Sequence, residues 1–213
     1  MVLAPGYSPL SFTPPSSGSY SLPTMGSAAD GTVLDSDGEI RQLHDFLGSK
    51  PTLLSFIFTS CDDVNGCPLA TYVMRSVQDK LLANPTTAES VRLVSFSFDP
   101  IFDTPDVIDA YGAQFRTGNF DWQFLTTSGA DTLDPILRAY DQWVIRDFNA
   151  DGEYLGTMSH ILRVFLIDRD RQIRNIYSTS FLHADTVAND IQTLLLEQNP
   201  GAQKTGSDRA AKR

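Results

Sequence analysis

One segment constrains this chain more than any other: an apolar run that leads directly into two cysteines and then into a helix. Residues 52–58 (TLLSFIF) are almost continuously apolar, which is typical of a strand covered on both faces in an α/β protein. The run ends in TSCDDVNGCP, and apolar residues then recur at helical spacing over 69–83. Pro68 suits the first turn of a helix. The pattern predicts a strand, a loop that carries Cys61 and Cys67, and a helix.

The rest of the chain alternates buried runs with helical periods. We expect further strands over 91–98, 120–125, 162–167 and 173–178, and further helices over 104–115, 132–143 and 185–197. Asp-Gly pairs mark the turns of two hairpins, one over 32–41 and one inserted over 144–157. This order predicts an α/β fold with a thioredoxin-like central sheet flanked by helices, an N-terminal hairpin and a hairpin insertion.

The sequence predicts one domain flanked by two tails. Residues 1–24 are rich in proline, serine and glycine and show no apolar period, so we expect a flexible leader. Residues 199–213 are polar and are expected to be a disordered tail. The thioredoxin-like domain is therefore predicted to span residues 25–198.

The charge balance excludes one class of partner. Acidic residues outnumber basic residues by 26 to 16, and the formal net charge is −10. Lysine and arginine cluster only at the end of the chain, whereas a nucleic-acid binder normally carries a basic patch. No stretch reaches the about 18–20 apolar residues that span a bilayer, and no signal-peptide pattern is visible. The negative field favours encounters with cations or basic surfaces.

The two cysteines, Cys61 and Cys67, lie too close together in the sequence to staple a small secreted domain. A local pair of this kind indicates redox chemistry or metal binding, with incidental core cysteines as the alternative. A helix N-terminus lowers the pKa of a thiol, and Cys67 has that placement, while Asp62 and Asp63 oppose thiolate formation. Two soft sulfurs suit Cu(I), a disulfide, or half of a zinc site.

A third ligand would decide between these chemistries, and His160 is the candidate. It stands just before the predicted strand in SHILRVFLID. In a thioredoxin-like sheet this position lies beside the cysteine loop, where the fold usually has a cis-proline. A ring nitrogen there could complete a site of two sulfurs and one nitrogen. A hydrogen-bonded loop histidine fits the local sequence equally well.

The other candidate ligands have simpler interpretations. His44 lies near the first hairpin without a motif, so we expect a surface histidine. His183 begins the turn before the last helix and is expected to be a capping or solvated residue. Met158 could be a weak thioether ligand, but methionine more often packs in a core.

Three segments together resemble the Sco/SenC family. FIFTSCDDVNGCPLATYVM resembles the family's cysteine motif, with matches in order at Phe58, Thr59, Cys61, Asp63, Val64, Cys67 and Pro68. VSFSFDPIFDTPDVIDAYGAQF resembles its second signature at Asp99-Pro100 and Asp103-Thr104-Pro105. SHILRVFLIDRDRQIRNIYS resembles the third, a histidine before a strand that ends in Leu-Ile-Asp.

The resemblance implies a thioredoxin-fold domain that binds copper, as Cu(I) or Cu(II), through Cys61, Cys67 and His160. Such proteins serve assembly of the copper centre of cytochrome oxidase, by metal delivery or by thiol–disulfide reduction. The implied partners are a copper-accepting protein, such as an oxidase subunit, and a thioredoxin-like reductant. We expect a monomer outside the cytoplasm whose signal or membrane anchor is not seen in this sequence, with a cytoplasmic location as the alternative. Zinc is the competing metal.

The cysteine loop departs from the family pattern in two ways. The family has three residues between its cysteines, whereas this chain has five, with Asn65-Gly66 as the apparent insertion. Asp62 also replaces the usual proline after the first cysteine. Gly66 permits a tight turn that can still bring the two sulfurs together. Metal affinity, redox potential and partner choice could therefore differ from those of the family.

Two enzyme functions compete with a copper metallochaperone. The first is a thiol–disulfide oxidoreductase that uses Cys61 and Cys67 without metal. The second is a peroxiredoxin-type peroxidase, which we disfavour because Thr59 lies only two positions before Cys61 and the usual Thr-x-x-Cys arrangement is absent. His160 discriminates between the chaperone and the dithiol enzyme, since a copper site uses it and a dithiol exchanger does not need it.

Overall fold

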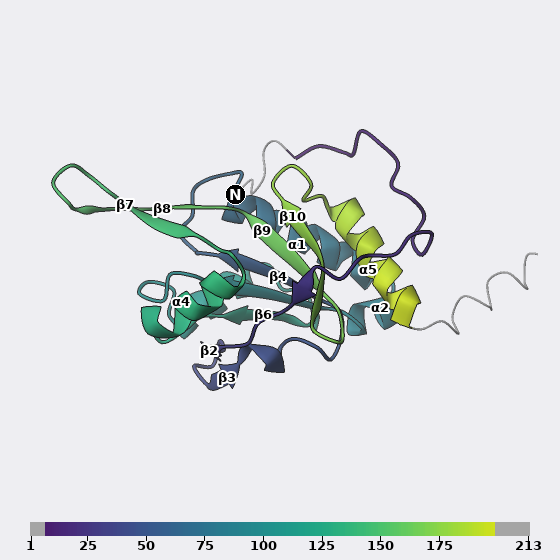
Figure 1. Ribbon diagram of the computed structural model, residues 1–213, viewed down its shortest axis with the longest axis horizontal. Coiled ribbons are helices and arrows are strands. Elements are labelled where there is room, and N and C mark those ends of the chain that lie inside the picture. The colour runs from purple at the N-terminus through teal and green to yellow at the C-terminus, as the bar shows by residue number, and fades with distance from the viewer. Residues whose placement is uncertain (1–6, 199–213) are drawn as a thin grey trace, which may run out of the picture.

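The computed structural model describes residues 7–198, except for the side chains of residues 154 and 156. The strands are β1 (Gly26–Ser27), β2 (Thr32–Leu34), β3 (Ile40–Gln42), β4 (Thr52–Ile57), β5 (Arg92–Ser97), β6 (Trp122–Leu125), β7 (Val144–Phe148), β8 (Tyr154–His160), β9 (Arg163–Ile167) and β10 (Gln172–Ser178). The helices are the short 3-10 helix η1 (Leu43–Asp45), α1 (Cys67–Leu82), α2 (Pro85–Glu89), α3 (Pro105–Ala113), α4 (Ala130–Ala139) and α5 (Ala184–Gln198). Figure 1 shows their arrangement.

The central sheet has the strand order β1-β10-β9-β4-β5-β6. β4, β5 and β6 are parallel, while β9 runs antiparallel to β4 and β10 antiparallel to β9. The carboxyl ends of β4 and β5 therefore meet at one edge of the sheet, which is where α/β proteins usually place their chemistry. The loop with Cys61 follows β4 at that edge, and Phe98 and Asp99 follow β5.

Helices cover both faces of the sheet (Figure 1). One core joins α1, α3 and α5 to residues such as Leu53 and Leu93 of the sheet. The other joins α4 and the β2–β3 hairpin to residues such as Leu54 and Phe56. Leu53 thus faces one core and Leu54 the other, which explains why β4 is buried on both faces and mostly apolar.

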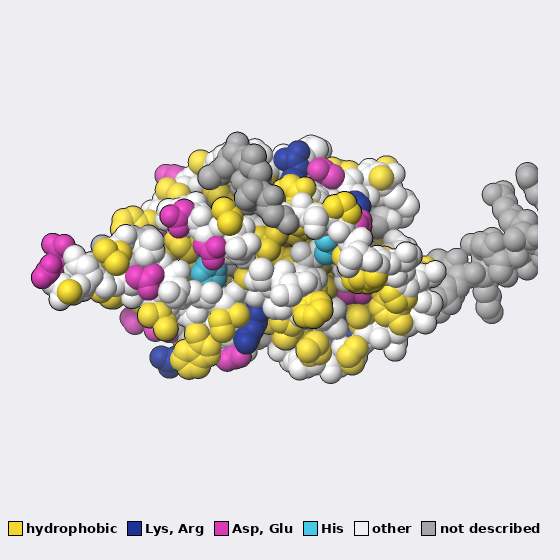
Figure 2. All heavy atoms as spheres, turned by 90° about the horizontal axis from the view of Figure 1, so that it is seen from above, with side chains coloured by type: hydrophobic (Ala, Val, Ile, Leu, Met, Phe, Trp, Pro, Cys, Tyr) yellow, Lys and Arg dark blue, Asp and Glu magenta, His cyan; other side chains and the backbone are white. Residues whose placement is uncertain are grey.

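The β7–β8 hairpin forms a separate two-stranded sheet that projects from the body of the molecule (Figure 1). Figure 2 shows acidic side chains at the tip of this arm, where Asp151 and Glu153 are exposed. At the base of the arm Val144 of β7 pairs with His160, the last residue of β8. The hairpin insertion therefore delivers His160 to the body of the protein.

The α/β fold, the flanking helices and both hairpins confirm the prediction from sequence. Two elements were not predicted: β1, a two-residue edge strand, and α2, in which the Asn84 side chain accepts a hydrogen bond from the Thr87 amide. The predicted helix over 132–143 is found at Ala130–Ala139, because the chain turns at Asp141, whose φ is 52°. No helix within residues 7–198 is both long and apolar enough to cross a membrane.

Residues 7–24 of the expected leader contain no helix or strand and contact α5. Tyr20 donates a hydrogen bond to Asp190 at 2.6 Å, and the Gly18 amide donates to Thr193 at 3.0 Å. Residues 1–6 of the leader and the predicted tail over 199–213 lie outside the described residues.

Candidate functional site

The loop between β4 and α1 is folded into tight turns by its own backbone. The Cys61 amide donates to the Phe58 carbonyl at 3.3 Å, and the Gly66 amide donates to the Asp63 carbonyl at 2.8 Å. A Cβ atom on Gly66 would lie only 3.3 Å from that carbonyl oxygen, so a side chain at this position would press on the turn. The expected role of Gly66 in closing the longer loop is therefore consistent with the structure.

Both cysteines are free thiols, buried in the core beneath this loop. The Cys67 side chain is 1% exposed, and the Phe58 amide donates to its Sγ atom at 3.4 Å. Cys61 is 8% exposed, and its interaction with the Cys67 thiol lowers the pKa of Cys61. The two thiols therefore lie close enough to influence each other's ionisation, and both a disulfide and a shared metal ion require such proximity.

The environment makes the two thiols unequal. The hydrogen bond from the Cys67 thiol lowers the pKa of Cys61 to about 7, helped by backbone N–H groups of Cys67 and Asp63. Burial raises the pKa of Cys67 well above its ordinary value. The helix N-terminus therefore does not lower the pKa of Cys67, because burial outweighs it. The Cys67 amide, at the start of α1, and the Asp63 amide in the loop favour the charged Cys61 sulfur, while burial of the Cys67 side chain disfavours its thiolate.

His160 meets the cysteines from the hairpin. Its Nε2 atom lies 3.6 Å from the Cys67 Sγ atom, and its Nδ1 atom lies 3.5 Å from the Met158 carbonyl oxygen. Its ring packs against Phe98, at 5.0 Å between ring centres, and against Phe58, at 5.9 Å. Burial lowers the pKa of His160 below its ordinary value of 6.5. A neutral ring with its proton on Nδ1 leaves the Nε2 lone pair directed at the sulfur.

Cys67 is thus the common neighbour of the other two predicted ligands. It interacts with the Cys61 thiol, and its Sγ atom lies 3.6 Å from the Nε2 atom of His160. Within residues 7–198, no three histidine, cysteine or acidic side chains converge as a ready-made metal site. The donor types themselves, a thiolate, a thiol and a neutral imidazole, fit a soft or borderline metal ion.

The remaining candidate ligands have other partners. His44 bonds through Nε2 to the Ala28 carbonyl at 3.0 Å and is partly exposed. His183 caps α5, because its Nδ1 atom accepts from the Asp185 amide at 3.2 Å, which confirms the expected capping role. The side chain of Met158 is buried in the core on the α4 side of the sheet, as expected for packing.

Sequence analysis placed Asp103 in a family signature but assigned it no role, whereas the structure shows it as a buried carboxylate that ties the cysteine loop to β5. It accepts hydrogen bonds from the Thr59 amide at 3.0 Å, from the Thr59 hydroxyl, and from the Ser97 hydroxyl at 2.5 Å. Thr59 lies two residues before Cys61, so Asp103 fixes the start of the loop. The signal was present in the Asp103-Thr104-Pro105 motif, because an aspartate just before a helix is seldom fully buried unless it is bonded.

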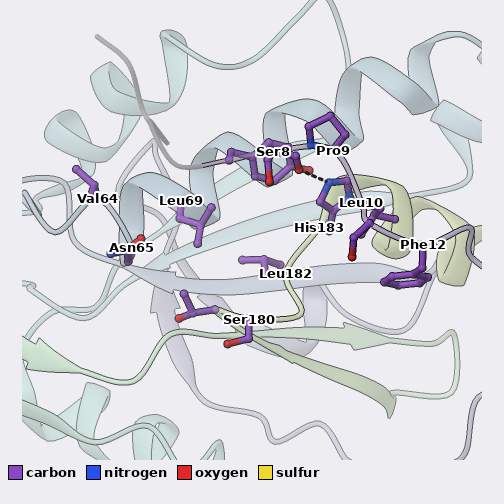
Figure 3. A pocket seen from close by; sticks show the side chains of 13 residues that line it. Ser8, Pro9, Leu10, Phe12, Val64, Asn65, Leu69, Ser180, Leu182 and His183 are labelled. Carbon is purple, nitrogen blue, oxygen red and sulfur yellow. Dashed lines mark hydrogen bonds between the residues drawn. The ribbon is translucent and has the colours of Figure 1, made fainter.

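A pocket of about 380 Å³ lies beside the cysteine loop. Figure 3 shows Val64, Asn65 and Leu69 at one end and residues Ser8–Phe12 with His183 at the other. His183 Nε2 lies 3.1 Å from the Ser8 carbonyl, which holds the N-terminal segment over the pocket. None of the three predicted metal ligands lines this pocket.

Comparisons with known proteins agree with this architecture. The family model described as SCO1/SenC matches residues 28–196. The SCO1 protein homolog of Bacillus subtilis (strain 168) is 35% identical over 147 residues, which cover 69% of this chain and 71% of that protein.

Two solved structures share the fold. Arabidopsis thaliana ScoI with copper bound has a TM-score of 0.67 at 21% identity, and the match covers 80% of this chain and 98% of that one. BsSco, described as a Sco family cytochrome c oxidase assembly protein with a disulfide switch, has a TM-score of 0.62 at 23% identity, with 81% and 96% covered. These likenesses confirm the thioredoxin-like fold. With the family match across residues 28–196, they establish that this chain belongs to the SCO1/SenC family.

Proposed function

We propose that this chain binds one copper ion through the Cys61 and Cys67 sulfurs and the Nε2 atom of His160, and delivers it during assembly of a copper centre. The recipient we propose is a copper-accepting protein such as a cytochrome oxidase subunit. One observation carries the proposal: the Nε2 atom of a histidine 93 residues away in the sequence lies 3.6 Å from the Cys67 sulfur.

The donor chemistry supports copper as cargo. Thiolates are soft ligands that favour Cu(I), and an imidazole nitrogen extends the site to Cu(II). With its pKa at about 7, Cys61 is substantially a thiolate at neutral pH, so it offers an anionic sulfur before the ion arrives. Binding of the ion by Cys67 would displace its proton, and small side-chain rotations would bring Cys61 and His160 to the same ion.

Zinc is the chemical competitor, because two sulfurs, one nitrogen and a water also make a zinc site. Copper is ranked first because the Arabidopsis relative holds it. A competition titration with both metals separates them. We expect one equivalent of copper to displace zinc from the reduced protein, as the Irving–Williams order requires for a site without special geometry. Retention of zinc in the presence of equimolar copper would exclude the proposal.

The ligand assignment is tested by variants. Reduced protein is titrated with Cu(I) and Cu(II) against a chelator of known affinity. Cys61→Ala and Cys67→Ala should each nearly abolish binding. His160→Ala should weaken Cu(II) binding more than Cu(I) binding, because two thiolates alone suffice for Cu(I). His44→Ala is the matched control, since His44 is bonded to Ala28 elsewhere in the fold. Equal affinities in wild type and His160→Ala would remove His160 from the site.

A thiol–disulfide oxidoreductase is the second candidate, favoured by the lowered pKa of Cys61 beside a free Cys67 thiol. In that reaction Cys61 and Cys67 form a disulfide and lose two hydrogens, while a disulfide of the partner is reduced to two thiols. A thioredoxin-like reductant would restore the dithiol. Activity that persists in His160→Ala, together with absent copper binding in wild type, would favour this function.

We also propose that the protein is a monomer and works outside the cytoplasm. Metal loading does not require a second copy, since all three ligands come from one chain. Sedimentation of the copper-loaded protein should therefore give a monomer, and a copper-bridged dimer would contradict the site. Cell fractionation tests the location.

A further inference from the structure

Asp99 is a buried carboxylate at the end of β5 that lacks a hydrogen bond on one oxygen. The residue is 2% exposed, and its Oδ1 atom has no hydrogen-bond partner. Burial and the nearby carboxylate of Asp103 both raise the pKa of Asp99. A buried acidic side chain of this kind needs a compensating charge.

That charge comes from the projecting hairpin. The Nη2 atom of Arg146, on β7, lies 3.6 Å from Asp99 Oδ1. This distance makes an ion pair rather than a hydrogen bond. Arg146 is 38% exposed at its side chain and Asp99 is 3% exposed, so the pair joins the surface of the hairpin to the interior of the body.

The hairpin places this ion pair next to His160. Arg146 pairs in register with Met158, and Val144 pairs with His160. Alternate residues of a strand share a face, so Arg146, Met158 and His160 lie on the face that meets the body. The residue before Asp99 is Phe98, whose ring packs on His160 at 5.0 Å. Two residues just after β5 therefore contact the hairpin: Phe98 packs on His160, and Asp99 pairs with Arg146.

We propose that Arg146 and Asp99 are positioning residues that hold the β7–β8 hairpin so that His160 faces Cys67. The hairpin belongs to a sheet of its own, so its docking depends on such side-chain contacts rather than on hydrogen bonds with the central sheet. Neither residue contacts the proposed copper ion. The consequence for copper rests on the function proposed above, whereas the consequence for the hairpin does not.

The first test needs no metal. Hydrogen–deuterium exchange is measured on the reduced, copper-free full chain in wild type, Arg146→Gln, Asp99→Asn and the double variant. We expect faster exchange over residues 144–160 in each variant and unchanged exchange in β4 and β5. Arg75→Gln is the matched control, because it removes an exposed ion pair with Asp79 on α1. Unchanged exchange over residues 144–160 in Arg146→Gln would overturn the proposal.

The second test measures Cu(II) affinity in the same proteins. Loss of a group that orients a metal ligand typically costs about 10–100-fold in affinity, so we expect at least about a tenfold loss in Arg146→Gln and none in Arg75→Gln. The double variant should lose no more than the more affected single variant, because the two residues act as a pair. Additive losses would contradict that pairing. If wild type bound no copper, the proposed function would fail, and the exchange experiment alone would decide the role of the ion pair.

Discussion

The Nε2 atom of His160 lies 3.6 Å from the Sγ atom of Cys67, although the hairpin that carries His160 and the helix that begins at Cys67 are separate elements. Each element alone carries only part of the proposed copper ligand set of Cys61, Cys67 and His160. Their contact depends on the folded state, so an ion bound across it stabilises the protein by mass action. His160 is therefore the residue that distinguishes a metal site from a dithiol that exchanges disulfides without metal.

The reactivity of Cys61 should report its lowered pKa. Because that pKa is lowered from 9.0 to about 7, the thiolate fraction rises as the pH passes through 7. The alkylation rate of Cys61 in reduced, metal-free protein should therefore reach half its maximum near pH 7, as followed by iodoacetamide labelling and mass spectrometry. Cys67 should stay unlabelled, since it is buried and its pKa is raised.

Cys67→Ala tests the cause of this shift. The substitution removes the thiol that donates to Cys61, so the midpoint for Cys61 labelling should move towards 9. A midpoint that stays near 7 in this variant would assign the effect to the backbone N–H groups instead. A midpoint near 9 in wild type would contradict the hydrogen bond itself.

His160 should make the metal-free protein less stable in acid. Burial lowers its pKa below 6.5, so the unfolded chain takes up the proton first and protonation favours unfolding. Stability from the neutral ring is therefore present above pH 6.5 and is lost as the pH falls below it. Urea unfolding at pH 7.5 and pH 5.5 should show a larger loss in wild type than in His160→Gln. Equal losses, or a ring titration midpoint above 6.5 by NMR, would oppose this account.

Asp103 should be essential for the cysteine loop although it contacts no sulfur in the structure. Asp103→Asn weakens the acceptor for Thr59 and Ser97, and hydrogen bonds to charged groups are worth about 1.5–3 kcal/mol each. We expect the free energy of unfolding in urea to fall by about 2 kcal/mol. Asp106→Asn, at an exposed aspartate of α3, is the control and should change it by less than about 1 kcal/mol. Similar losses in the two variants would contradict the role of Asp103.

Much of the fold could be predicted because its buried elements leave strong patterns. The apolar run of β4 and the helical period of α1 required only local sequence. Short elements left weaker signals. β1 is two residues long, and α2 is marked only by Asn84 before Pro85, a cap followed by a proline at the first helical position.

The site was harder to predict, because its properties arise from packing. Sequence placed Cys61, Cys67 and His160 near one another, but the lower thiol pKa belongs to Cys61 because Cys67 is desolvated. The pairing of Asp99 with Arg146 depends on how the hairpin docks, and no local pattern in β7 encodes that contact.

The most direct test of the central claim is X-ray absorption spectroscopy at the copper edge on protein loaded with one equivalent of Cu(II), in wild type and in His160→Ala. We predict a first coordination shell of two sulfurs and one nitrogen in wild type, and two sulfurs without the nitrogen in His160→Ala, with His44→Ala identical to wild type. A shell of two sulfurs alone in wild type, or a nitrogen that persists in His160→Ala, would contradict the assignment of His160 as a copper ligand.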